Sequence, residues 1–465
     1  MERRDFLQSA TLVATAGATG ATGMAATTGV LAAEAANDGA LRLAQAGAAS
    51  APAAVAEAAH RGPLTRRWVE QRWVLDNIIQ ANGIDWDQPR SVYWNVPCGI
   101  AASADFAAIR QRVKKYADCS PAFESVARRR EATARAAEEA RDLVTARENY
   151  FMAAIHWGAA QWPIDENNEQ NLAYNKKKRE CFAAYARLAD HRVEPVWIPF
   201  DGKALPAWFH LPPGYSGGRI PVVVFVPGMD SFKEASVWMY GDPYLSRGFA
   251  VLAMEGPGQY ECPTLGIYMS MGGWEATGKA CMDWLMQRPE VDPEQVAISG
   301  RSFGSFAGTI AASAEPRYRA CAVSATCHEP GWHTIFQEAS PTFKMRFMYM
   351  ANYTDEAKFD DFRTTLTWEG RAEKIRMPYL CAAGEFDELS PLENTERLLK
   401  ALQGPKRFVV YQESRHATAG VASTNLGPYL PAMVADWIAA RFRGESFPSE
   451  RWFVDATGRV TKTPL

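Results

Sequence analysis

Short apolar runs rich in β-branched residues alternate with helical patterns through the second half of the chain, and this alternation restricts the fold more than any other feature. The runs occupy residues 221–228, 248–258, 294–300, 318–326, 377–384 and 406–413. Helical patterns lie between and after them, as at 270–287, 302–314 and 427–442. Continuous apolar runs are typical of buried parallel strands, and strands joined by helices form a parallel sheet. The pattern therefore predicts an α/β fold.

The residues that precede these strand-like runs indicate where the domains begin and end. Two strand-like runs in 193–214 flank Asp201-Gly202, which indicates an antiparallel hairpin that opens the sheet. Apolar residues recur at helical spacing in 66–83, 120–161 and 171–190. We expect a helical domain at 64–192, an α/β domain at 193–445 and a C-terminal tail at 446–465.

The N-terminus has the pattern of an export signal. Arg3-Arg4-Asp5-Phe6-Leu7-Gln8 matches the twin-arginine signal, and a weakly apolar run follows to about Ala33. We expect residues 1–46 to be a removable signal peptide and linker, and the Ala/Pro-rich segment 47–63 to be a flexible linker. The alternative is a disordered tail with a chance arginine pair. The signal predicts a twin-arginine translocase as partner and a periplasmic or secreted enzyme.

Composition excludes several classes of partner. The 465 residues are 47% hydrophobic and 22% charged, which is ordinary for a globular protein with a sizeable core. A net charge of −3 gives no indication of binding to nucleic acid or to an anionic membrane. No other segment is apolar enough to span a membrane. The eight cysteines form no C-x-x-C or zinc spacing, so we predict buried thiols, and neither a metal nor a cofactor.

The sequence Gly300-Arg301-Ser302-Phe303-Gly304 has the pattern of a nucleophile elbow. A buried strand-like run precedes Ser302 and a helical segment rich in small residues follows it. Such a turn brings strand and helix backbones close together, so it needs glycines and holds the serine in a strained conformation. The context therefore favours Ser302 as a catalytic nucleophile over a serine in a structural turn.

Acid and base partners follow Ser302 in the chain. Asp387 comes just after the run at 377–384, and His416 just after the run at 406–413. Carboxyl ends of parallel strands meet at one edge of a sheet, where open α/β sheets build their sites. His416 would accept the serine proton, and Asp387 would orient and stabilise its imidazole. Glu385 and Glu388 are neighbouring alternatives for the acid.

A serine nucleophile also needs an oxyanion hole. The sequence VPGMDSFKE follows an early buried strand, where enzymes with this order of residues place one amide donor. We assign the backbone N–H groups of Met229 and Phe303 to this role. The alternative for Met229 is a plain glycine turn that leads into a helix.

These segments together resemble a known family. The motifs PGMDSFKE, GFAVLAMEGPGQYE, GRSFG, EPRYRA, GEFDELSP and RHATAG, in this order, are similar to those of α/β hydrolases grouped with 2,6-dihydroxypseudooxynicotine hydrolase, the fungal yellowish-green pigment hydrolases and the fermentation–respiration switch esterase. ARENYFMAAIHWG and RECFAAYA resemble the helical lid of that group. The resemblance, over about residues 65–442, implies an α/β-hydrolase core with an N-terminal helical lid, no metal and often a homodimer. It also implies the triad Ser302, Asp387 and His416, and cleavage of esters or of the C–C bond of 1,3-diketone-like substrates.

The chain departs from the family pattern in two places. Tyr260 stands where the family usually has glycine, and TCHEPGWHTIF (326–336) matches the substrate-side residues of no one member. Because this second segment follows a strand end, we expect its polar residues near the substrate pocket, with ordinary loop polarity as the alternative. Tyr150 and Trp157 share a face of an expected lid helix and are further pocket candidates, with helix packing as the alternative. The polar candidates are His328, Glu329 and His333.

The sequence thus predicts an exported serine hydrolase that acts on a small-molecule substrate. The expected reaction is hydrolysis of carboxylic esters of a small aromatic molecule, and C–C hydrolysis of aromatic 1,3-diketone-like substrates is the main alternative. A peptidase and a non-catalytic binding protein are further alternatives. The helical pattern of 64–192 disfavours the peptidase, because peptidases of the prolyl-oligopeptidase kind carry a β-propeller.

Overall fold

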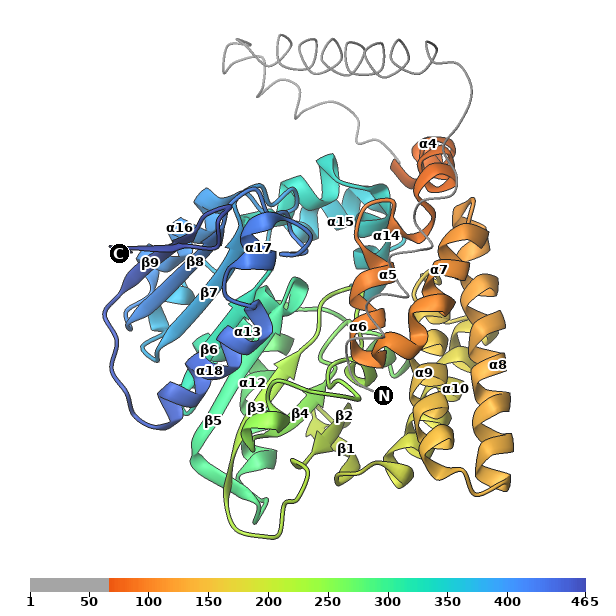
Figure 1. Ribbon diagram of the computed structural model, residues 1–465. Coiled ribbons are helices and arrows are strands. Elements are labelled where there is room, and N and C mark those ends of the chain that lie inside the picture. The colour runs from red at the N-terminus through yellow and green to blue at the C-terminus, as the bar shows by residue number, and fades with distance from the viewer. Residues whose placement is uncertain (1–66) are drawn as a thin grey trace, which may run out of the picture. The chain divides into compact units, whose positions relative to one another are not determined.

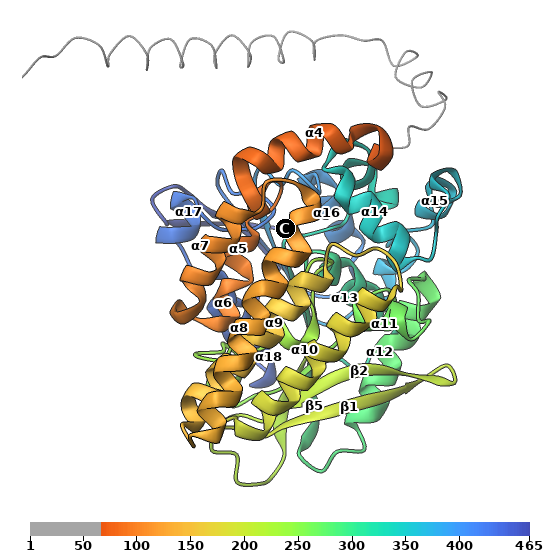
Figure 2. The same ribbon diagram turned by 90° about the vertical axis from the view of Figure 1, so that its right-hand side faces the viewer.

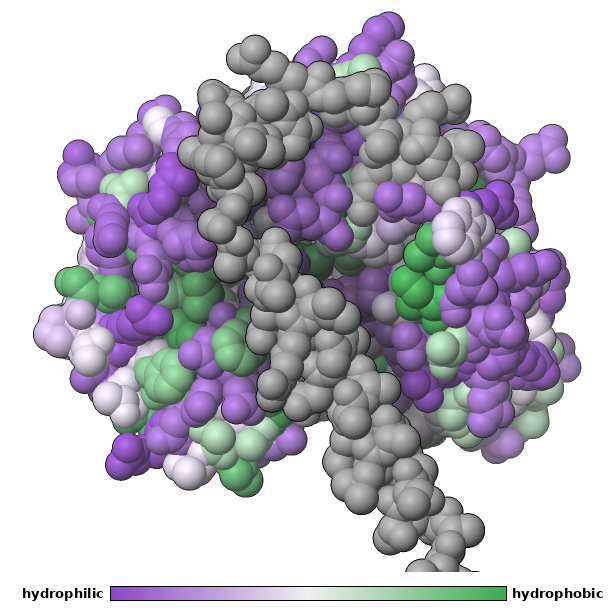
Figure 3. Space-filling view, turned by 90° about the horizontal axis from the view of Figure 1, so that it is seen from above, coloured by the Kyte–Doolittle hydropathy of each residue, from purple (hydrophilic) through white to green (hydrophobic). Residues whose placement is uncertain are grey.

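The computed structural model describes residues 67–465, which lie within one unit that begins at Thr65 (Figure 1). The expected signal peptide at 1–46 and linker at 47–63 lie outside the described residues. Within the described range, no helix has the length and apolar character needed to cross a bilayer. In the space-filling view of Figure 3, most visible described side chains are hydrophilic, and hydrophobic ones form smaller areas between them.

A ten-stranded sheet forms the centre of the α/β domain, in the order β1-β2-β4-β3-β5-β6-β7-β8-β9-β10. Strands β3 to β9 run parallel, whereas β1 and β2 form an antiparallel hairpin and β2 also pairs antiparallel with β4. Asp201 and Gly202 turn the hairpin with φ of 44° and 69°. The α/β-hydrolase fold expected from the sequence is confirmed. The strands are β1 (Val193–Phe200), β2 (Lys203–His210), β3 (Ile220–Val226), β4 (Ala250–Met254), β5 (Val291–Arg301), β6 (Ala320–Ser324), β7 (Tyr379–Gly384), β8 (Lys406–Tyr411), β9 (Glu450–Val454) and β10 (Val460–Pro464).

The C-terminal segment corrects one expectation. Residues 446–465 were expected to be a tail, but β9 pairs parallel with β8 and β10 pairs antiparallel with β9, so the segment extends the sheet. The run ERWFV combines aromatic and β-branched residues, and Asp455 and Gly458 close the turn after it. A single short run with exposed polar neighbours gives only a weak strand signal, because pairing with β8 supplies most of its stability.

Alternate residues of each strand face two separate apolar layers. Val223 packs with the lid and with α18, whereas Val222 and Val224 pack with α12 and α13 on the other face. This alternation follows from the two-residue period of a strand. The helices of the α/β domain are α11 (Glu261–Thr264), α12 (Met271–Leu285), α13 (Phe303–Ala314), α14 (Pro341–Met350), α15 (Glu356–Arg363), α16 (Leu392–Ala401), α17 (Ala422–Leu426) and α18 (Leu430–Phe442).

Seven helices make up the described part of the lid. Three long ones, α8, α9 and α10, pack side by side (Figure 2); α4 lies at their upper end, and α5 and α6 lie on the side nearer to the α/β domain (Figure 1). The helical run expected at 120–161 is two helices, because Arg141 adopts a left-handed φ of 66° and ends the first. The lid helices are α4 (Arg67–Asn82), α5 (Arg90–Tyr93), α6 (Asn95–Cys98), α7 (Ser103–Arg112), α8 (Cys119–Glu139), α9 (Leu143–Gln161) and α10 (Glu169–Leu188).

Candidate active site

Ser302 lies on a strained turn between β5 and α13. Its backbone has φ 57° and ψ −124°, a conformation that costs energy for any residue with a side chain. The two flanking glycines allow the turn: a Cβ on Gly300 would lie 2.0 Å from the Gly304 carbonyl oxygen, and a Cβ on Gly304 would lie 2.1 Å from the Val226 oxygen. This is the geometry of a nucleophile elbow, which presents the serine hydroxyl above the end of the sheet.

His416 and Asp387 complete a hydrogen-bonded chain with Ser302. The Ser302 Oγ is 2.9 Å from His416 Nε2, and His416 Nδ1 is 3.0 Å from each carboxylate oxygen of Asp387. Asp387 Oδ1 also accepts backbone N–H bonds from Leu389 and Ser390, which hold the carboxylate in place. The three residues follow β5, β7 and β8, so the parallel sheet brings them to one edge, as expected from their positions in the sequence.

The surroundings of His416 favour its charged form. Burial of the imidazole opposes its charge, but the facing Asp387 carboxylate and the hydrogen bond to it raise the pKa of His416 well above its usual value. The carboxylate also fixes the proton on Nδ1, so that Nε2 faces the serine hydroxyl. The arrangement can therefore take a proton from Ser302 and stabilise the resulting imidazolium.

The two glutamates near Asp387 have other contacts. Glu388 accepts the backbone N–H of His416 at 2.9 Å and the side-chain amide of Gln88 at 3.2 Å. Glu385 accepts the backbone N–H of Glu413 at 2.9 Å. Neither therefore takes the place beside the His416 ring, which belongs to Asp387. Glu388 instead positions the loop that carries His416.

Two backbone amides are available next to the serine hydroxyl. Met229 and Phe303 line the same cavity as Ser302, and among the described residues their N–H groups have no acceptor. The loop that carries Met229 lies directly against the serine, since a Cβ on Gly228 would be 3.1 Å from Ser302 Cβ. Phe303 is the first residue of α13, so its N–H is one of those that a helix leaves unbonded. Both amides can hold a negative oxygen.

The cavity above Ser302 has a volume of about 530 Å³ and is lined by the lid as well as by the α/β domain. Val92, Tyr93 and Val96 of α5 and α6 contribute from the lid. Most of its wall is apolar, which suits a small organic molecule. Residues from the α/β domain include Trp238, Trp332, Ile335, Phe343, Cys327, Tyr411 and Tyr429.

The segment 326–336 contributes to the cavity, but not through the residues that the sequence singled out. His328 is buried away from it, with Nδ1 3.2 Å from the Thr395 hydroxyl, and its burial lowers its pKa to about 3. Glu329 accepts the backbone N–H and hydroxyl of Thr334, so it caps a local turn. His333 lies beside Glu338 and does not line the cavity.

Tyr150 and Trp157 of α9 also lie outside this cavity. The Tyr150 hydroxyl donates to Glu138 at 2.9 Å, and the Trp157 indole donates to Glu131 at 3.2 Å. Both acceptors belong to α8, so these side chains pack α8 and α9 together, which is the alternative weighed from the sequence. The lid instead reaches the cavity through α5 and α6, which are too short to show a helical period in the sequence.

Asp230, next to Met229, is the point at which the lid holds the loop beside Ser302. Its carboxylate accepts the Arg90 guanidinium at 3.0 Å, the Trp162 indole at 3.0 Å and the Tyr93 hydroxyl at 3.3 Å. Its carbonyl oxygen accepts the Trp94 indole at 3.0 Å. Arg90 in turn packs against the adjacent rings of Trp86 and Trp162, with its guanidinium 4.2 Å from each ring centroid.

Tyr260, the departure from the family glycine, belongs to the same assembly. Its φ is 28° and ψ is −84°, in the positive range that glycine adopts most easily, so a tyrosine here carries backbone strain. The Tyr260 hydroxyl is 3.4 Å from the Asp230 carbonyl oxygen, and its ring packs on Phe232. The tyrosine thus adds contacts to the loop in exchange for backbone strain.

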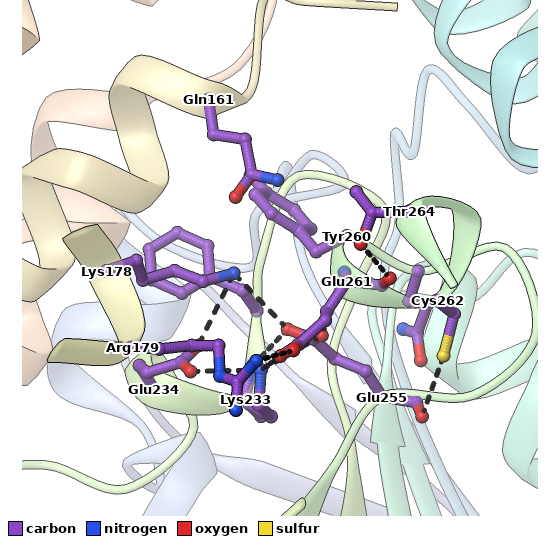
Figure 4. A network of polar contacts seen from close by, with 12 residues as sticks. Gln161, Lys178, Arg179, Lys233, Glu234, Glu255, Tyr260, Glu261, Cys262 and Thr264 are labelled. Carbon is purple, nitrogen blue, oxygen red and sulfur yellow. Dashed lines mark hydrogen bonds and ion pairs between the residues drawn. The ribbon is translucent and has the colours of Figure 1, made fainter. Parts of the chain in front are cut away.

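A buried ionic cluster holds the far end of the same loop (Figure 4). Lys233 Nζ lies 2.7 Å from Glu261, 3.0 Å from Glu234 and 3.2 Å from Glu255. Lys178 of α10 lies 3.7 Å from Glu234 and 4.0 Å from Glu255, so the lid contributes to this cluster too. The lid therefore contacts the segment 228–234 at both of its ends.

Comparisons with known proteins agree with the fold. A model of the prolyl oligopeptidase family matches residues 243–445. The chain is 31% identical over 209 residues to α/β hydrolase xenA of Xenoacremonium sinensis, covering 43% of this chain and 49% of that protein. It is 32% identical over 182 residues to the 20-hydroxy-prefusarin hydrolase of Gibberella moniliformis, covering 37% and 43%. The chain thus spans about half the length of the curated relatives it matches.

Solved structures extend the likeness to the lid. The crystal structure of 2,6-dihydroxy-pseudo-oxynicotine hydrolase matches with a TM-score of 0.65 at 22% identity, over 77% of this chain and 97% of that one. AbyA5 matches with a TM-score of 0.55 at 18% identity, over 74% and 90%. The resemblance predicted from the sequence motifs is confirmed: this chain is an α/β hydrolase in fold, similar to 2,6-dihydroxy-pseudo-oxynicotine hydrolase and to the fungal α/β hydrolases.

Proposed function

We propose that the protein is a serine hydrolase that cleaves carboxylic esters of a small aromatic molecule, with Ser302, His416 and Asp387 as its catalytic triad. The observation that carries this proposal is the continuous hydrogen-bonded chain from Ser302 Oγ through His416 to Asp387 at the floor of a cavity of about 530 Å³. The fold could make this turn without a strained serine, a paired histidine and two unbonded amides. Their presence together therefore favours a catalytic role over a structural one.

The reaction follows from these positions. His416 Nε2 takes the Ser302 proton while Oγ attacks the carbonyl carbon, and the carbonyl oxygen gains its negative charge beside the Met229 and Phe303 amides. His416 then gives its proton to the leaving alcohol as the C–O bond breaks. Water, deprotonated by His416, attacks the acyl-serine, and the acid leaves as Ser302 recovers the proton.

The cavity supports a small aromatic substrate. Its volume lies within the range usual for small-molecule sites, and the rings of Trp238, Trp332 and Phe343 supply flat apolar walls. Helices α5 and α6 form part of the wall, which narrows the space for an extended peptide. We therefore favour a small ester over a peptide substrate.

C–C hydrolysis of a 1,3-diketone is the second candidate. In this reaction the C–C bond of the Ser302 adduct breaks, and the leaving group is an enolate. The enolate must be stabilised and then protonated at carbon. Arg301 places a guanidinium donor in the same cavity as Ser302, and a cationic donor suits an enolate oxygen better than it suits an alcohol.

One substrate panel tests both candidates. The purified protein and its Ser302→Ala variant are assayed with aryl esters of graded acyl length and with aromatic 1,3-diketones. We expect turnover of esters that the variant loses by a factor of at least about 10³, and labelling of the wild type alone by a fluorophosphonate. Faster cleavage of diketones than of esters would assign C–C hydrolysis. Equal activity of both proteins would refute a Ser302 nucleophile, and no labelling would favour a non-catalytic binding protein.

We also propose that the protein is exported through the twin-arginine translocase. The support is the sequence Arg3-Arg4-Asp5-Phe6-Leu7-Gln8. Replacement of both arginines by lysine keeps the charge but removes the pattern that the translocase reads. We expect wild-type protein in the periplasmic or secreted fraction and the double variant in the cytoplasm. Equal distribution of the two would contradict this route.

A further inference from the structure

Arg301, the residue before the nucleophile, faces the cavity without an acidic partner. It is the last residue of β5 and lines the cavity together with Ser302. Its Nη2 donates a hydrogen bond to the Ala417 carbonyl oxygen at 2.5 Å. Within residues 67–465, no carboxylate pairs with it, and the ionisable groups that interact with it are the phenols of Tyr93 and Tyr429, which are neutral near pH 7. The guanidinium thus keeps unused donors and an uncompensated charge.

Two buried arginines, neither of which lines the cavity, are paired with carboxylates. Arg90 contacts Asp87 and Asp230, and Arg346 contacts Asp165. Arg301 is half-buried, and the loss of hydration disfavours its charge and lowers its pKa, so the unpaired cation is destabilised in the free protein. A ligand that brings a negative charge to Arg301 removes this destabilisation.

The remaining titratable groups of the cavity leave this charge free. Asp230 is occupied by Arg90, Trp162 and Tyr93, and His416 is paired with Asp387. Cys327, Tyr411 and Tyr429 are the other titratable side chains of the wall. Burial raises the pKa of Tyr411 and of Tyr429, so neither phenol carries a negative charge near neutral pH. Arg301 is therefore the group to which an incoming anion is attracted.

We propose that Arg301 binds a planar oxyanion of the substrate, a carboxylate or an ionised enol, while Ser302 attacks the carbonyl carbon. A guanidinium offers two parallel N–H donors that match such a group, and a water-poor cavity strengthens the contact. The proposal rests on the proposed function, because it places the anion on the substrate of Ser302. It narrows the substrate class to acidic aromatic acyl compounds.

Binding to a catalytically silent protein tests the site apart from the reaction. In the Ser302→Ala background, calorimetry compares 4-acetylbenzoate with its neutral amide, and ionised benzoylacetone with its 2,2-dimethyl analogue, which has no enol. We expect the anion of at least one pair to bind about tenfold or more tightly than its neutral partner, as one charge-assisted contact implies. The pair that shows the preference tells whether a carboxylate or an enolate is the natural group.

A matched pair of variants assigns the preference to Arg301. Added to Ser302→Ala, Arg301→Met should bring the ratio of neutral to anion dissociation constants close to one. Arg397→Met should leave it unchanged, because Arg397 is an exposed residue paired with Glu369 and lies outside the cavity. A ratio near one in Ser302→Ala itself, or a ratio that survives Arg301→Met, would overturn the proposal.

Turnover separates anion binding from support of the His416 loop. Since Arg301 donates to Ala417, its loss can also slow catalysis by releasing that loop. We expect Arg301→Met to lower kcat/KM about tenfold more for a carboxylate-bearing aryl ester than for its methyl-ester analogue, and Arg301→Lys to retain part of the preference. An equal loss on both esters would mean that Arg301 only supports the loop. If Ser302→Ala retained full turnover, the proposed function would be refuted. The ratios of neutral to anion dissociation constants would still test the Arg301 site independently.

Discussion

Arg90 in the lid and Asp230 in the loop beside Ser302 form a buried ion pair, with Nη2 3.0 Å from Oδ2. The Arg90 side chain is fully buried and packs against two tryptophan rings. Asp230 directly follows Met229, whose amide we assign to the oxyanion hole. The lid therefore does more than cover the cavity, because it fixes the backbone that the reaction needs.

Arg90→Met should reduce both stability and catalysis. It leaves the Asp230 carboxylate partly buried without its cation, which typically costs about 3–5 kcal/mol in the free energy of unfolding. We also expect kcat for an ester to fall more than KM rises, because the Met229 amide loses its fixed position. Arg110→Met removes an exposed lid arginine paired with Asp85 and should cost less than about 1 kcal/mol. Equal denaturation midpoints and kcat values for the two variants would show that the pair does not hold the loop.

The pH dependence of the reaction should follow His416. The imidazole acts as a base only when it is neutral, so kcat/KM should rise with pH through its pKa, which Asp387 raises above the usual value. Asp387→Asn removes that carboxylate, so the rising limb should move to lower pH while kcat falls by about 10⁴, as in related triads. A pH–rate profile of both proteins measures this. A limb that stays in place would mean that another group sets it.

Two glycines of the same helix provide a direct test of the nucleophile elbow. A Cβ on Gly304 would lie 2.1 Å from the Val226 carbonyl oxygen, so Gly304→Ala must push α13 away from β3 and displace Ser302. We expect a loss of about 3 kcal/mol or more in stability, and loss of fluorophosphonate labelling. Gly308→Ala is the control, since its Cβ would meet Ile298 at an ordinary 3.9 Å and alanine favours a helix by about 1 kcal/mol. Wild-type labelling of Gly304→Ala would contradict this account of the turn.

The sequence predicted best the features that depend on local pattern. Strand–helix alternation gave the parallel sheet, and a sheet of parallel strands necessarily brings the loops after β5, β7 and β8 to one edge. Ser302, Asp387 and His416 could therefore be predicted to meet without knowledge of any long-range contact. The same reasoning could not exclude Glu385 and Glu388 in favour of Asp387. Which of the three carboxylates meets His416 depends on the direction in which each side chain points.

The cavity wall depended on contacts that no local pattern encodes. His328 does follow a strand end, but its ring turns beneath α16 toward Thr395, while the neighbouring Cys327 and Trp332 face the cavity. Val92 and Tyr93 reach Ser302 from about 200 positions earlier in the chain, through helices of only four residues. The sequence GRSFG did contain one usable signal, since an arginine next to a nucleophile in an apolar surrounding calls for a partner.

Lys178→Met should show that the cluster in Figure 4 joins lid and core. The cluster joins three cations to three carboxylates, so loss of one lysine leaves an excess of buried negative charge. The cations are Lys178, Arg179 and Lys233, and the carboxylates are those of Glu234, Glu255 and Glu261. We expect a loss of about 3–5 kcal/mol in the free energy of unfolding. Lys176→Met on the same helix is the control, because its exposed contact with Glu180 should contribute less than about 1 kcal/mol.

The pH dependence of that loss distinguishes a charge effect from a packing effect. Burial raises the pKa of Glu234, but Lys178 and Lys233 outweigh it and bring the value from 4.5 down to about 2. A lowered pKa contributes stability that is present above about pH 4.5 and is lost as the pH falls toward about 2. Lys178 also acts on Glu255, whose pKa burial raises and with which Glu234 interacts. The difference between Lys178→Met and wild type should therefore be largest near neutral pH and should shrink as the two glutamates take up protons on acidification. Urea unfolding across this range measures the difference, and a pH-independent gap would assign the effect to lost packing of the lysine stem instead.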